Sequence, residues 1–379
     1  MGKIIFLSSI TLLLPLLSAC AESRNSSVVA TWQVDTAAVL AIGAVEGNPV
    51  YQLYRVRGIV ELPDGGIAIA NNGSSEIRLY DPNGRFVRAL GRDGSGPGEF
   101  AGLANLVARG DTLYAYDLMY GRLTRFLSSG TYLDDRSLRC DATMLPPHFL
   151  GLLRDGAVAA WTHVYPSSDG FGRASVVQLL IDQDGTADTL GSFPGNENVI
   201  QRRDLGGGVG TTTSWFWSFY RRFLGVAGGD RIYAAPTDSA IIYVWDGSGA
   251  PLDALQWDDM PRPLDDAVAT ALFQQETANL EPAERDKERE AFREAARPEA
   301  APVFSHLVLG PGGELWVHRF DQPGGEVSDW LVFDADGSLR AHARIPRERV
   351  IRAIGRERVY TLERDEYDVE YVRGYRLLR

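Results

Sequence analysis

The sequence predicts an all-β fold, a six-bladed β-propeller with four-stranded antiparallel blades. Three observations lead to this prediction: a β-rich unit recurs along the chain, its hairpin turns contain glycine, and the units follow at a regular spacing. Gly84 and Gly130 lie 46 residues apart, and Gly249 and Gly337 are again 46 apart once a helical insertion of about 42 residues is taken out. A repeat of this length, with four strands in each unit, is typical of a propeller.

Each unit has two recognisable parts. The first is a short turn followed by a β-rich run, as in LPDGGIAIA (62–70) and GPGGELWVHR (310–319). The second consists of two β-rich runs joined by a tight turn that contains glycine, as in IRLYDPNGRFVRAL (77–90) and WLVFDADGSLRAHA (330–343). Apolar and polar residues alternate in both parts, which indicates paired antiparallel strands with one buried face. Six copies of the unit predict six blades.

The sixth copy, residues 348–379, supplies only three strands. We expect TWQVDTAAVLAIG (31–43) to provide the missing outer strand, which closes the ring and removes exposed sheet edges. Residues 260–301 depart from the repeat. There Asp265 suits the start of one helix and Pro282 the start of a second, so a helical hairpin is expected to be inserted in the ring.

The N-terminus is predicted to be a targeting segment. The apolar run IIFLSSITLLLPLL is short for a membrane span and suits a signal peptide, here residues 1–19. It ends in LSAC (17–20), which resembles the bacterial lipobox and implies that Cys20 is lipidated. Residues 20–28 would then link the anchor to a propeller at 29–379, and Ala21 implies the outer membrane if the cell has one. An ordinary secretory signal with a chance cysteine is the alternative.

Composition limits the classes of partner. The chain has 50 Asp and Glu against 38 Lys and Arg, a net charge of −12. This argues against nucleic-acid binding, because the phosphate backbone requires excess positive charge. The net negative charge does not exclude a small anionic ligand that is bound by a local cluster of arginines. Cys140 is the only cysteine besides Cys20, so we expect no internal disulfide and no zinc site. We also expect a monomer.

The segment GRDGSGPGEF (91–100) could bind a phosphate or turn a corner. A P-loop places a lysine after its glycines, whereas Pro97 and Glu99 stand there in this chain. We therefore expect a corner between the first two blades, with Phe100 packed between them. The segment resembles a repeat feature of bacterial six-bladed propellers of the NHL-repeat type. That resemblance covers most of 29–379, although only the first blade shows the motif, and it implies a platform for interactions.

Variation in loop length is confined to one face of the predicted ring. Turns between first and second strands, and between third and fourth strands, are uniformly short. The second-to-third loops and the links between blades, on the opposite face, are irregular and include 162–173, 194–217 and 320–329. GGGVG (206–210) is expected to be a flexible linker. We expect this variable face to bind the ligand.

Two kinds of residue on the variable face are candidate ligand contacts. TTTSWFWSFYRRF (211–223) combines aromatic side chains that could stack on a sugar or peptide with two arginines that could meet an anion. Packing between blades is the alternative use of the same aromatic residues. The second kind comprises polar residues on the loops. The predicted ligand-binding residues are Asp117, Tyr120, His163, Trp215, Trp217, Arg221, Arg222, Arg319, Asp321 and Arg364.

Two functions stay open at this point. The first is a lipid-anchored binding platform of the cell envelope for a protein, peptide or glycan. The alternative is a Ca²⁺-dependent hydrolase, lactonase or lyase, because similar propellers of the gluconolactonase and paraoxonase type hold Ca²⁺ with Glu, Asn and Asp. The chain contains no G-x-S-x-G, H-E-x-x-H or paired catalytic carboxylate pattern. We therefore favour binding, predict no catalytic or metal-binding residue, and retain Ca²⁺ as the one candidate cofactor.

Overall fold

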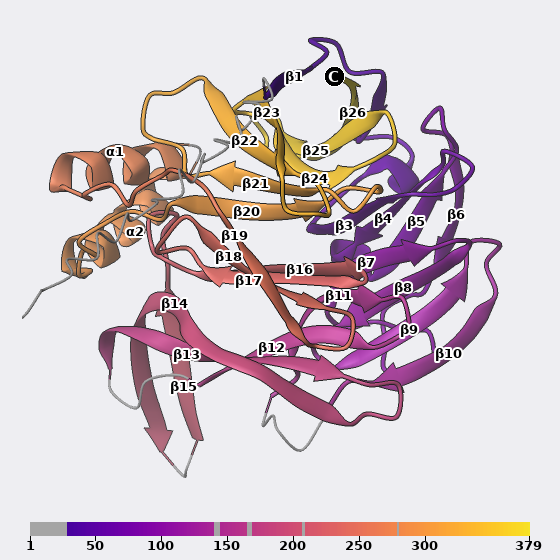
Figure 1. Cartoon of the computed structure of the whole chain (residues 1–379), viewed down its shortest axis with the longest axis horizontal. Coiled ribbons are helices and arrows are strands. Elements are labelled where there is room, and N and C mark those ends of the chain that lie inside the picture. Colours follow the sequence, from indigo (N-terminus) through magenta and orange to yellow (C-terminus); the bar gives the residue numbers. More distant parts are fainter. Residues whose placement is uncertain (1–28, 140–144, 165–168, 207–208, 279) are drawn as a thin grey trace, which may run out of the picture.

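The computed structural model describes residues 29–139, 145–164, 169–206, 209–278 and 280–379, of which the side chains of 201–215 and 294 are left aside. Six β-sheet blades form a ring, and their inner strands surround a central channel (Figure 1). The inner strands are β3 (Val56–Glu61), β7 (Leu103–Arg109), β11 (His148–Leu153), β16 (Phe223–Gly229), β20 (Phe304–Leu309) and β24 (Val350–Ile354). The predicted fold class is confirmed.

Four blades have the predicted four antiparallel strands. Blade 1 adds to its inner strand β4 (Ile67–Asn71), β5 (Glu76–Tyr80) and β6 (Phe86–Leu90). Blade 2 adds β8 (Thr112–Asp117), β9 (Arg122–Leu127) and β10 (Tyr132–Ser137). Blade 4 adds β17 (Arg231–Pro236), β18 (Ile241–Asp246) and β19 (Pro251–Gln256). Blade 5 adds β21 (Leu315–Arg319), β22 (Val327–Phe333) and β23 (Leu339–Pro346).

The N-terminal segment closes the ring, as predicted. Blade 6 consists of β24, β25 (Arg358–Arg364), β26 (Glu370–Leu378) and, as its outer strand, β2 (Leu40–Ile42), which pairs antiparallel with β26. The preceding strand, β1 (Ala30–Val34), pairs parallel with β23 of blade 5 and, at its end, antiparallel with β26. The segment therefore joins blades 5 and 6 as well as completing blade 6.

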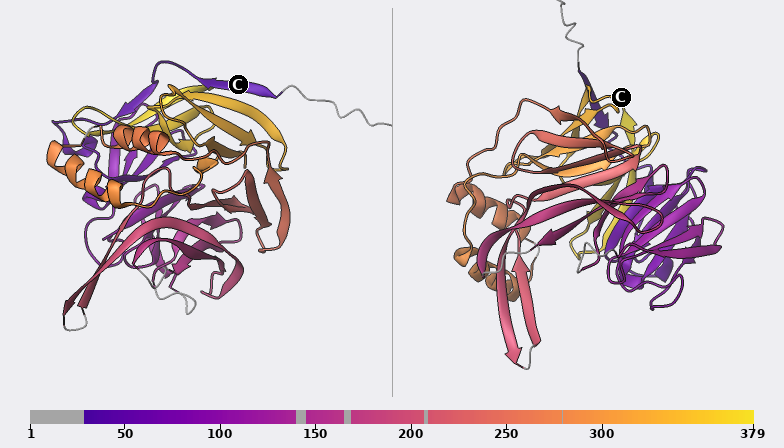
Figure 2. Two further views of the ribbon diagram at one scale, coloured as in Figure 1. Left: turned by 90° about the vertical axis from the view of Figure 1, so that its left-hand side faces the viewer. Right: turned by 60° about the horizontal axis from the view of Figure 1, so that its bottom comes forward.

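Blade 3 is larger than predicted. It contains β11, β12 (Val158–Val164), β13 (Gly170–Ile181) and β14 (Ala187–Gly206), and β14 continues into a hairpin with β15 (Val209–Trp215) that projects from the ring (Figure 2). The predicted irregular loop at 194–217 was wrong, because most of its described residues lie in strands. Of the linker predicted at 206–210, Gly206, Val209 and Gly210 lie in strands and residues 207–208 lie outside the described residues. Thr and Trp favour strands. The ladder between β14 and β15 supplies backbone partners that a loop would lack.

The helical insertion is confirmed. It consists of α1 (Asp266–Glu276) and α2 (Pro282–Glu294), and the carboxylate of Asp265 caps α1 by accepting a backbone N–H of its first turn at 2.8 Å. The two helices and the β14–β15 hairpin lie on the same side of the ring (left in Figure 1). This side is the predicted variable face. Two short 3₁₀ turns belong to the first blade, η1 (Pro49–Tyr51) and η2 (Asn72–Ser74).

The glycine-rich segment 91–100 turns a corner between blades 1 and 2. Gly91 and Gly98 have φ angles of 78° and 72°, in the left-handed region that favours glycine. Glu99 closes the corner by accepting the backbone N–H of Gly96 at 2.7 Å. Phe100 is fully buried in a cluster of residues from both blades. The predicted use of this segment is confirmed.

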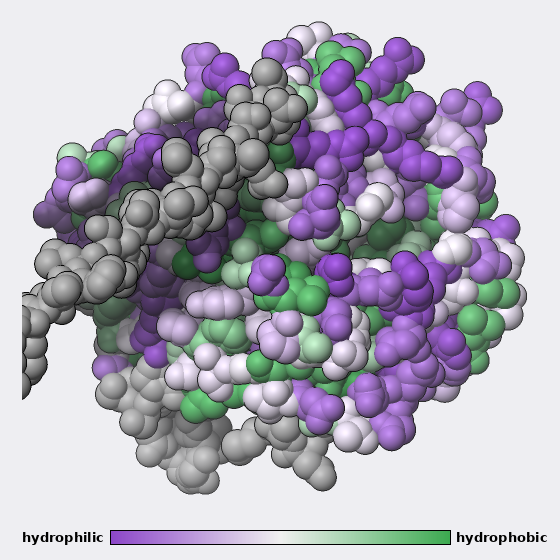
Figure 3. All heavy atoms as spheres, in the orientation of Figure 1, coloured by the Kyte–Doolittle hydropathy of each residue, from purple (hydrophilic) through white to green (hydrophobic). Residues whose placement is uncertain are grey.

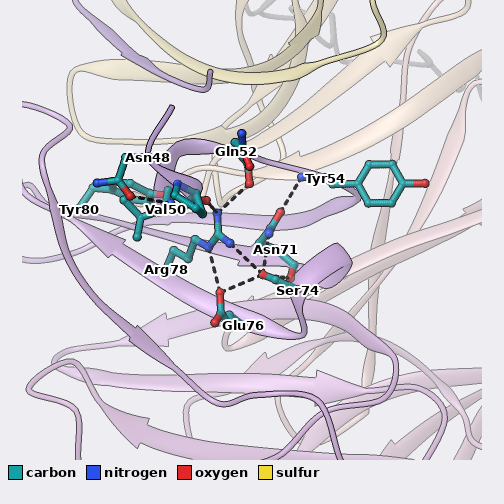
Figure 4. A network of polar contacts seen from close by, with 10 residues as sticks. Asn48, Val50, Gln52, Tyr54, Asn71, Ser74, Glu76, Arg78 and Tyr80 are labelled. Carbon is teal, nitrogen blue, oxygen red and sulfur yellow. Dashed lines mark hydrogen bonds and ion pairs between the residues drawn. The ribbon is translucent and has the colours of Figure 1, made fainter. Parts of the chain in front are cut away.

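A buried arginine, Arg78 in β5, fixes the segment that leads from the N-terminal strands into blade 1 (Figure 4). Its guanidinium donates to the carbonyl oxygens of Pro49 at 2.9 Å and Gln52 at 2.7 Å. It also pairs with Glu76 at 3.1 Å and donates to the Ser74 hydroxyl at 3.2 Å. The Arg78 side chain therefore anchors the backbone at Pro49 and Gln52, which lie outside the paired strands.

The described surface offers few apolar areas in the view of Figure 3. Hydrophobic and hydrophilic residues are interspersed there. A large continuous apolar patch would indicate a docking surface for another protein.

Candidate ligand site in the central channel

The inner strands of five blades carry a β-bulge, at one register position in blades 1, 2 and 5 and two residues nearer the short turn in blades 3 and 6. A bulge places one residue outside the strand ladder and can re-aim its side chain, and bulges are common beside functional sites. In each of these strands the register skips one residue against the second strand of its blade. The skipped residues are Arg57, Ala104, Leu150, Ser305 and Arg352.

The central channel is positively charged in an acidic protein. It has a volume of about 1130 Å³ and extends along the inner strands to the short turns that follow them. Its charged lining residues are Arg57, Glu61, Arg109, Arg154, Asp230, Arg231, Arg352 and Arg356. Six arginines and two carboxylates share this space, whereas the whole chain has a net charge of −12. Low-dielectric walls concentrate such a field and attract anions.

Several arginines at the short-turn end of the channel serve the ring itself. Arg109 of blade 2 donates to the carbonyl oxygen of Arg154 in blade 3 at 3.0 Å. Arg154 in turn pairs with Asp230 of blade 4 at 3.1 Å, and Arg356 of blade 6 pairs with Glu61 of blade 1 at 3.2 Å. These contacts cross from blade to blade. They explain the presence of these three arginines without a ligand.

Arg57 and Arg352 differ, because neither makes a side-chain hydrogen bond or an ion pair within the described part of the chain. Both lie on bulges of adjacent blades and line the channel. Burial lowers the pKa of Arg352; the charge of Glu370 opposes this, and those of Arg57 and Arg364 add to it. The two cations thus lie near each other in the channel with their side chains partly accessible to water, an arrangement that an anion would stabilise.

A third arginine, Arg222, approaches the same region from the link before β16. Its guanidinium lies over the ring of Phe216 at 5.1 Å. Burial lowers the pKa of Arg222, and the charge of Glu276 in α1 opposes that change. Burial, together with the charges of His318, Arg352 and Arg222, lowers the pKa of His306 to about 3. Arg222 and Arg352 therefore converge near His306 of β20.

Histidines accompany this cluster in two blades. In blade 3, His148 stacks on Trp161 with ring centroids 4.0 Å apart, and His163 lies 5.3 Å from His148. In blade 5, His306 and His318 are opposite each other on β20 and β21. Only His163 and His318 were expected near the site. His148 and His306 were missed, although both lie at the N-terminal ends of inner strands, where the sequence repeat would have placed them.

We expect His148 to make the protein less stable in acid. Burial and the charge of His163 lower the pKa of His148 to about 4, below the 6.5 of an unfolded histidine. Between these values the unfolded chain binds a proton that the folded chain does not, so the stabilising contribution is complete above pH 6.5 and falls as the pH drops to about 4. His148→Phe should flatten this slope in urea unfolding at pH 7 and pH 4.5. An unchanged slope would contradict the assignment.

Two predicted ligand residues, Asp117 and Tyr120, shape the loop after β8. The Asp117 carboxylate is fully buried and accepts the backbone N–H groups of Ala101, Gly102, Met119 and Tyr120 at 2.7–3.1 Å. The ring of Tyr120 lies 5.2 Å from the Arg122 guanidinium. Asp117 thus has a structural role, and the ligand-binding role of both residues stays a prediction.

Trp217, Phe219 and Tyr220 of the aromatic stretch are packed beneath the helical insertion, whereas Phe216 is 59% exposed. Trp217 is 4% exposed and stacks on Phe219 with an interplanar angle of 2°. It belongs to one cluster with residues of α1 and α2. The side chain of Trp215 lies outside the described side chains. Arg221 is engaged by Glu197, and by Asp238 at 3.3 Å, so of the two predicted arginines only Arg222 joins the cationic cluster.

Three further predicted residues have carboxylate or imidazole partners. Arg364 pairs with Asp368 and Glu370, each at 2.8 Å. Arg319 donates to Asp259 at 2.8 Å, and Asp321 lies 3.3 Å from His318. Arg319 and Asp321 line a second cavity of about 310 Å³. The structure therefore brings these last two together, as the sequence predicted, but beside the channel. Cys20 and Cys140 lie outside the described residues.

The described residues include no group of three or more His, Cys, Asp or Glu side chains placed to hold a metal ion. Ca²⁺ binding stays a prediction. None of the helices within the described ranges is long and apolar enough to span a membrane.

Comparisons with known proteins define the class as a six-bladed β-propeller. A family model with this description matches residues 51–147, in blades 1 and 2. A protein from Bacteroides fragilis is similar over 92% of this chain and 96% of its own, with 13% identity and a TM-score of 0.50. A DUF4221-family protein from Bacteroides vulgatus is similar over 91% and 98%, with 11% identity and a TM-score of 0.52. No curated protein sequence matches. These likenesses show the fold alone.

Proposed function

We propose that the chain is a lipoprotein of the bacterial cell envelope whose propeller binds an anionic ligand in its central channel. The observation that carries this proposal is the pair Arg57 and Arg352. They lie on bulges of adjacent blades, line a cavity of about 1130 Å³ and form no ion pair among the described residues. Two unpaired guanidinium groups in one channel are suited to bind a carboxylate, phosphate or sulfate, often through two parallel hydrogen bonds.

The variable face supports a ligand larger than a simple ion. The helices α1 and α2 and the β14–β15 hairpin stand on this side of the ring (Figure 2). Arg222 adds a third positive charge on this side of the ring, where the charge of Glu276 in α1 acts on it. A peptide or glycan with an acidic group would place that group between the arginines while the rest contacts the loops. A monomer, lipidated at Cys20 and held at the outer membrane, completes the proposal.

We expect anions to stabilise the protein against heat, and this effect to require Arg57 and Arg352. Acetate, citrate, glucuronate, phosphate and sulfate would be compared by thermal unfolding of the full chain in detergent. A ligand at 100 times its dissociation constant adds about 2.7 kcal/mol to the stability of the native state. Arg352→Gln should weaken binding about 10–100-fold, since a hydrogen bond to a charged group contributes about 1.5–3 kcal/mol.

Arg154→Gln is the matched control. It removes the same charge from the same channel, but Arg154 is paired with Asp230 at the far end. Its affinity for the best anion should stay within about twofold of the wild type, given that screened pairs contribute little. The proposal fails if no anion stabilises the protein, or if Arg154→Gln and Arg352→Gln weaken binding equally.

A further inference from the structure

Blade 5 contains a serine, a histidine and an aspartate in a row, with a hydrogen bond between the first two and a close contact without hydrogen-bond geometry between the last two. The Ser305 hydroxyl lies 2.8 Å from Nδ1 of His318, and Nε2 of His318 lies 3.3 Å from Oδ2 of Asp321. Ser305 occupies the bulge of β20, at the register position that holds Arg57 in β3, whereas the bulge with Arg352 in β24 lies two residues nearer the short turn. The row therefore begins at the level of the cationic cluster and ends at the second cavity, which Asp321 lines.

The imidazole in the middle of the row is held in place. His318 stacks on Trp330 with ring centroids 4.5 Å apart and an interplanar angle of 13°. Burial opposes ionisation of Asp321, but the contact with His318, the Ser328 hydroxyl and the charge of Arg347 together hold its pKa below the usual range. An ionised Asp321 favours the proton on Nε2 of His318. Nδ1 is then free to accept the proton of the Ser305 hydroxyl.

The surroundings of Ser305 suit the attack of a hydroxyl on a carbonyl group. His306 Nδ1 lies 3.3 Å from the Ser305 oxygen, and its low pKa keeps this second imidazole neutral. The charges that lower that pKa include those of Arg222 and Arg352. Positive charge this close favours an oxyanion that develops at the reacting carbon.

We propose that Ser305 is the nucleophile of an acyl-ester hydrolase, with His318 as general base and Asp321 as the residue that orients it. The substrate class, an ester that carries a negative charge near the scissile bond, rests on the proposed anion site. The Ser305 oxygen bonds to the acyl carbon while its proton passes to His318. The ester C–O bond then breaks, and the alcohol leaves with that proton. Water adds to the acyl-serine, gives its proton to His318 and releases the acid, which restores the hydroxyl.

Labelling with a fluorophosphonate tests the nucleophile without knowledge of the substrate. The full chain in detergent would be treated with the probe and the modified peptide identified by mass spectrometry. We expect label on Ser305 and none in Ser305→Ala. His318→Gln should slow labelling at least about 100-fold, the lower range for loss of a general base. Ser338→Ala, which changes a serine that is bonded only within its hairpin turn, should label at the wild-type rate.

A pair of p-nitrophenyl esters tests the substrate class. We expect the hemisuccinate to be hydrolysed faster than the neutral acetate, and Arg352→Gln to abolish this preference. If Ser305 is labelled but the hemisuccinate is not hydrolysed faster than the acetate, the proposed substrate class is overturned, whereas the assignment of Ser305 as nucleophile stands. No label on Ser305, in a protein that anions still stabilise, would overturn the hydrolase and leave the binding function intact.

Discussion

Gly151→Ala is expected to disrupt the contact between blades 3 and 4. Gly151 of β11 pairs in parallel with Ala227 of β16, and a Cβ atom on Gly151 would lie 1.8 Å from the carbonyl oxygen of Ala227. The obstacle is backbone on both sides, so no side chain can turn away to make room. Overpacking in a core usually costs about 1–3 kcal/mol, and we expect about 3 kcal/mol or more here because an inner-strand pairing must open.

Urea unfolding of Gly151→Ala and Gly247→Ala measures this effect. An added Cβ on Gly247 meets its nearest heavy atom at 3.6 Å, an ordinary contact, so Gly247→Ala should leave the midpoint nearly unchanged. A Gly151→Ala protein as stable as the control would mean that the inner strands of blades 3 and 4 are further apart than described.

Arg78→Ala is expected to lower the free energy of unfolding by about 3 kcal/mol. The substitution removes two partly buried hydrogen bonds from the guanidinium to the carbonyl oxygens of Pro49 and Gln52, and a hydrogen bond to a charged group contributes about 1.5–3 kcal/mol. Arg78→Lys should recover only part of the loss, because an ammonium group cannot reproduce the planar fork that serves Pro49, Gln52, Ser74 and Glu76.

Arg344→Ala is the control for Arg78→Ala. Arg344 and Asp329 form an exposed pair at 3.6 Å, which should contribute less than about 0.5 kcal/mol. Equal stability losses in the two alanine variants, measured by urea unfolding, would contradict the structural role of Arg78.

The ring was predictable from local patterns, whereas the long hairpin of blade 3 was not. Turns with glycine and runs of alternating apolar and polar residues define paired strands within a few residues, and this pattern recurs in each blade. The β14–β15 extension interrupts that repeat. GGGVG at 206–210 has the composition of a linker, yet Gly206 and Val209 are paired across two strands, which the composition alone does not reveal.

The site was harder to predict because its residues come from different blades. Arg57 and Arg352 are alike only through their bulges, and a bulge is visible in the register of two strands and not in one sequence run. Asp117 and Trp217 show that the chemistry of a residue type does not reveal its surroundings. Polar and aromatic residues suggest a ligand site. In the structure, however, the Asp117 carboxylate accepts hydrogen bonds from backbone amides, and Trp217 is buried by core packing. Arg222 and Asp321 were named from the sequence for their chemistry, and the structure puts them beside the channel.

Blade 6 also sets an order for folding. Its sheet contains β2 from one end of the described chain and β25 and β26 from the other, with Ala41 opposite Arg373. Blades 1 to 4 can form from neighbouring segments soon after each leaves the ribosome, but the pairing of β2 must wait for β26. Contacts between such distant segments form slowly, because a large loop must close first. During synthesis the strand β2 is therefore an unpaired edge that needs protection until the last blade arrives.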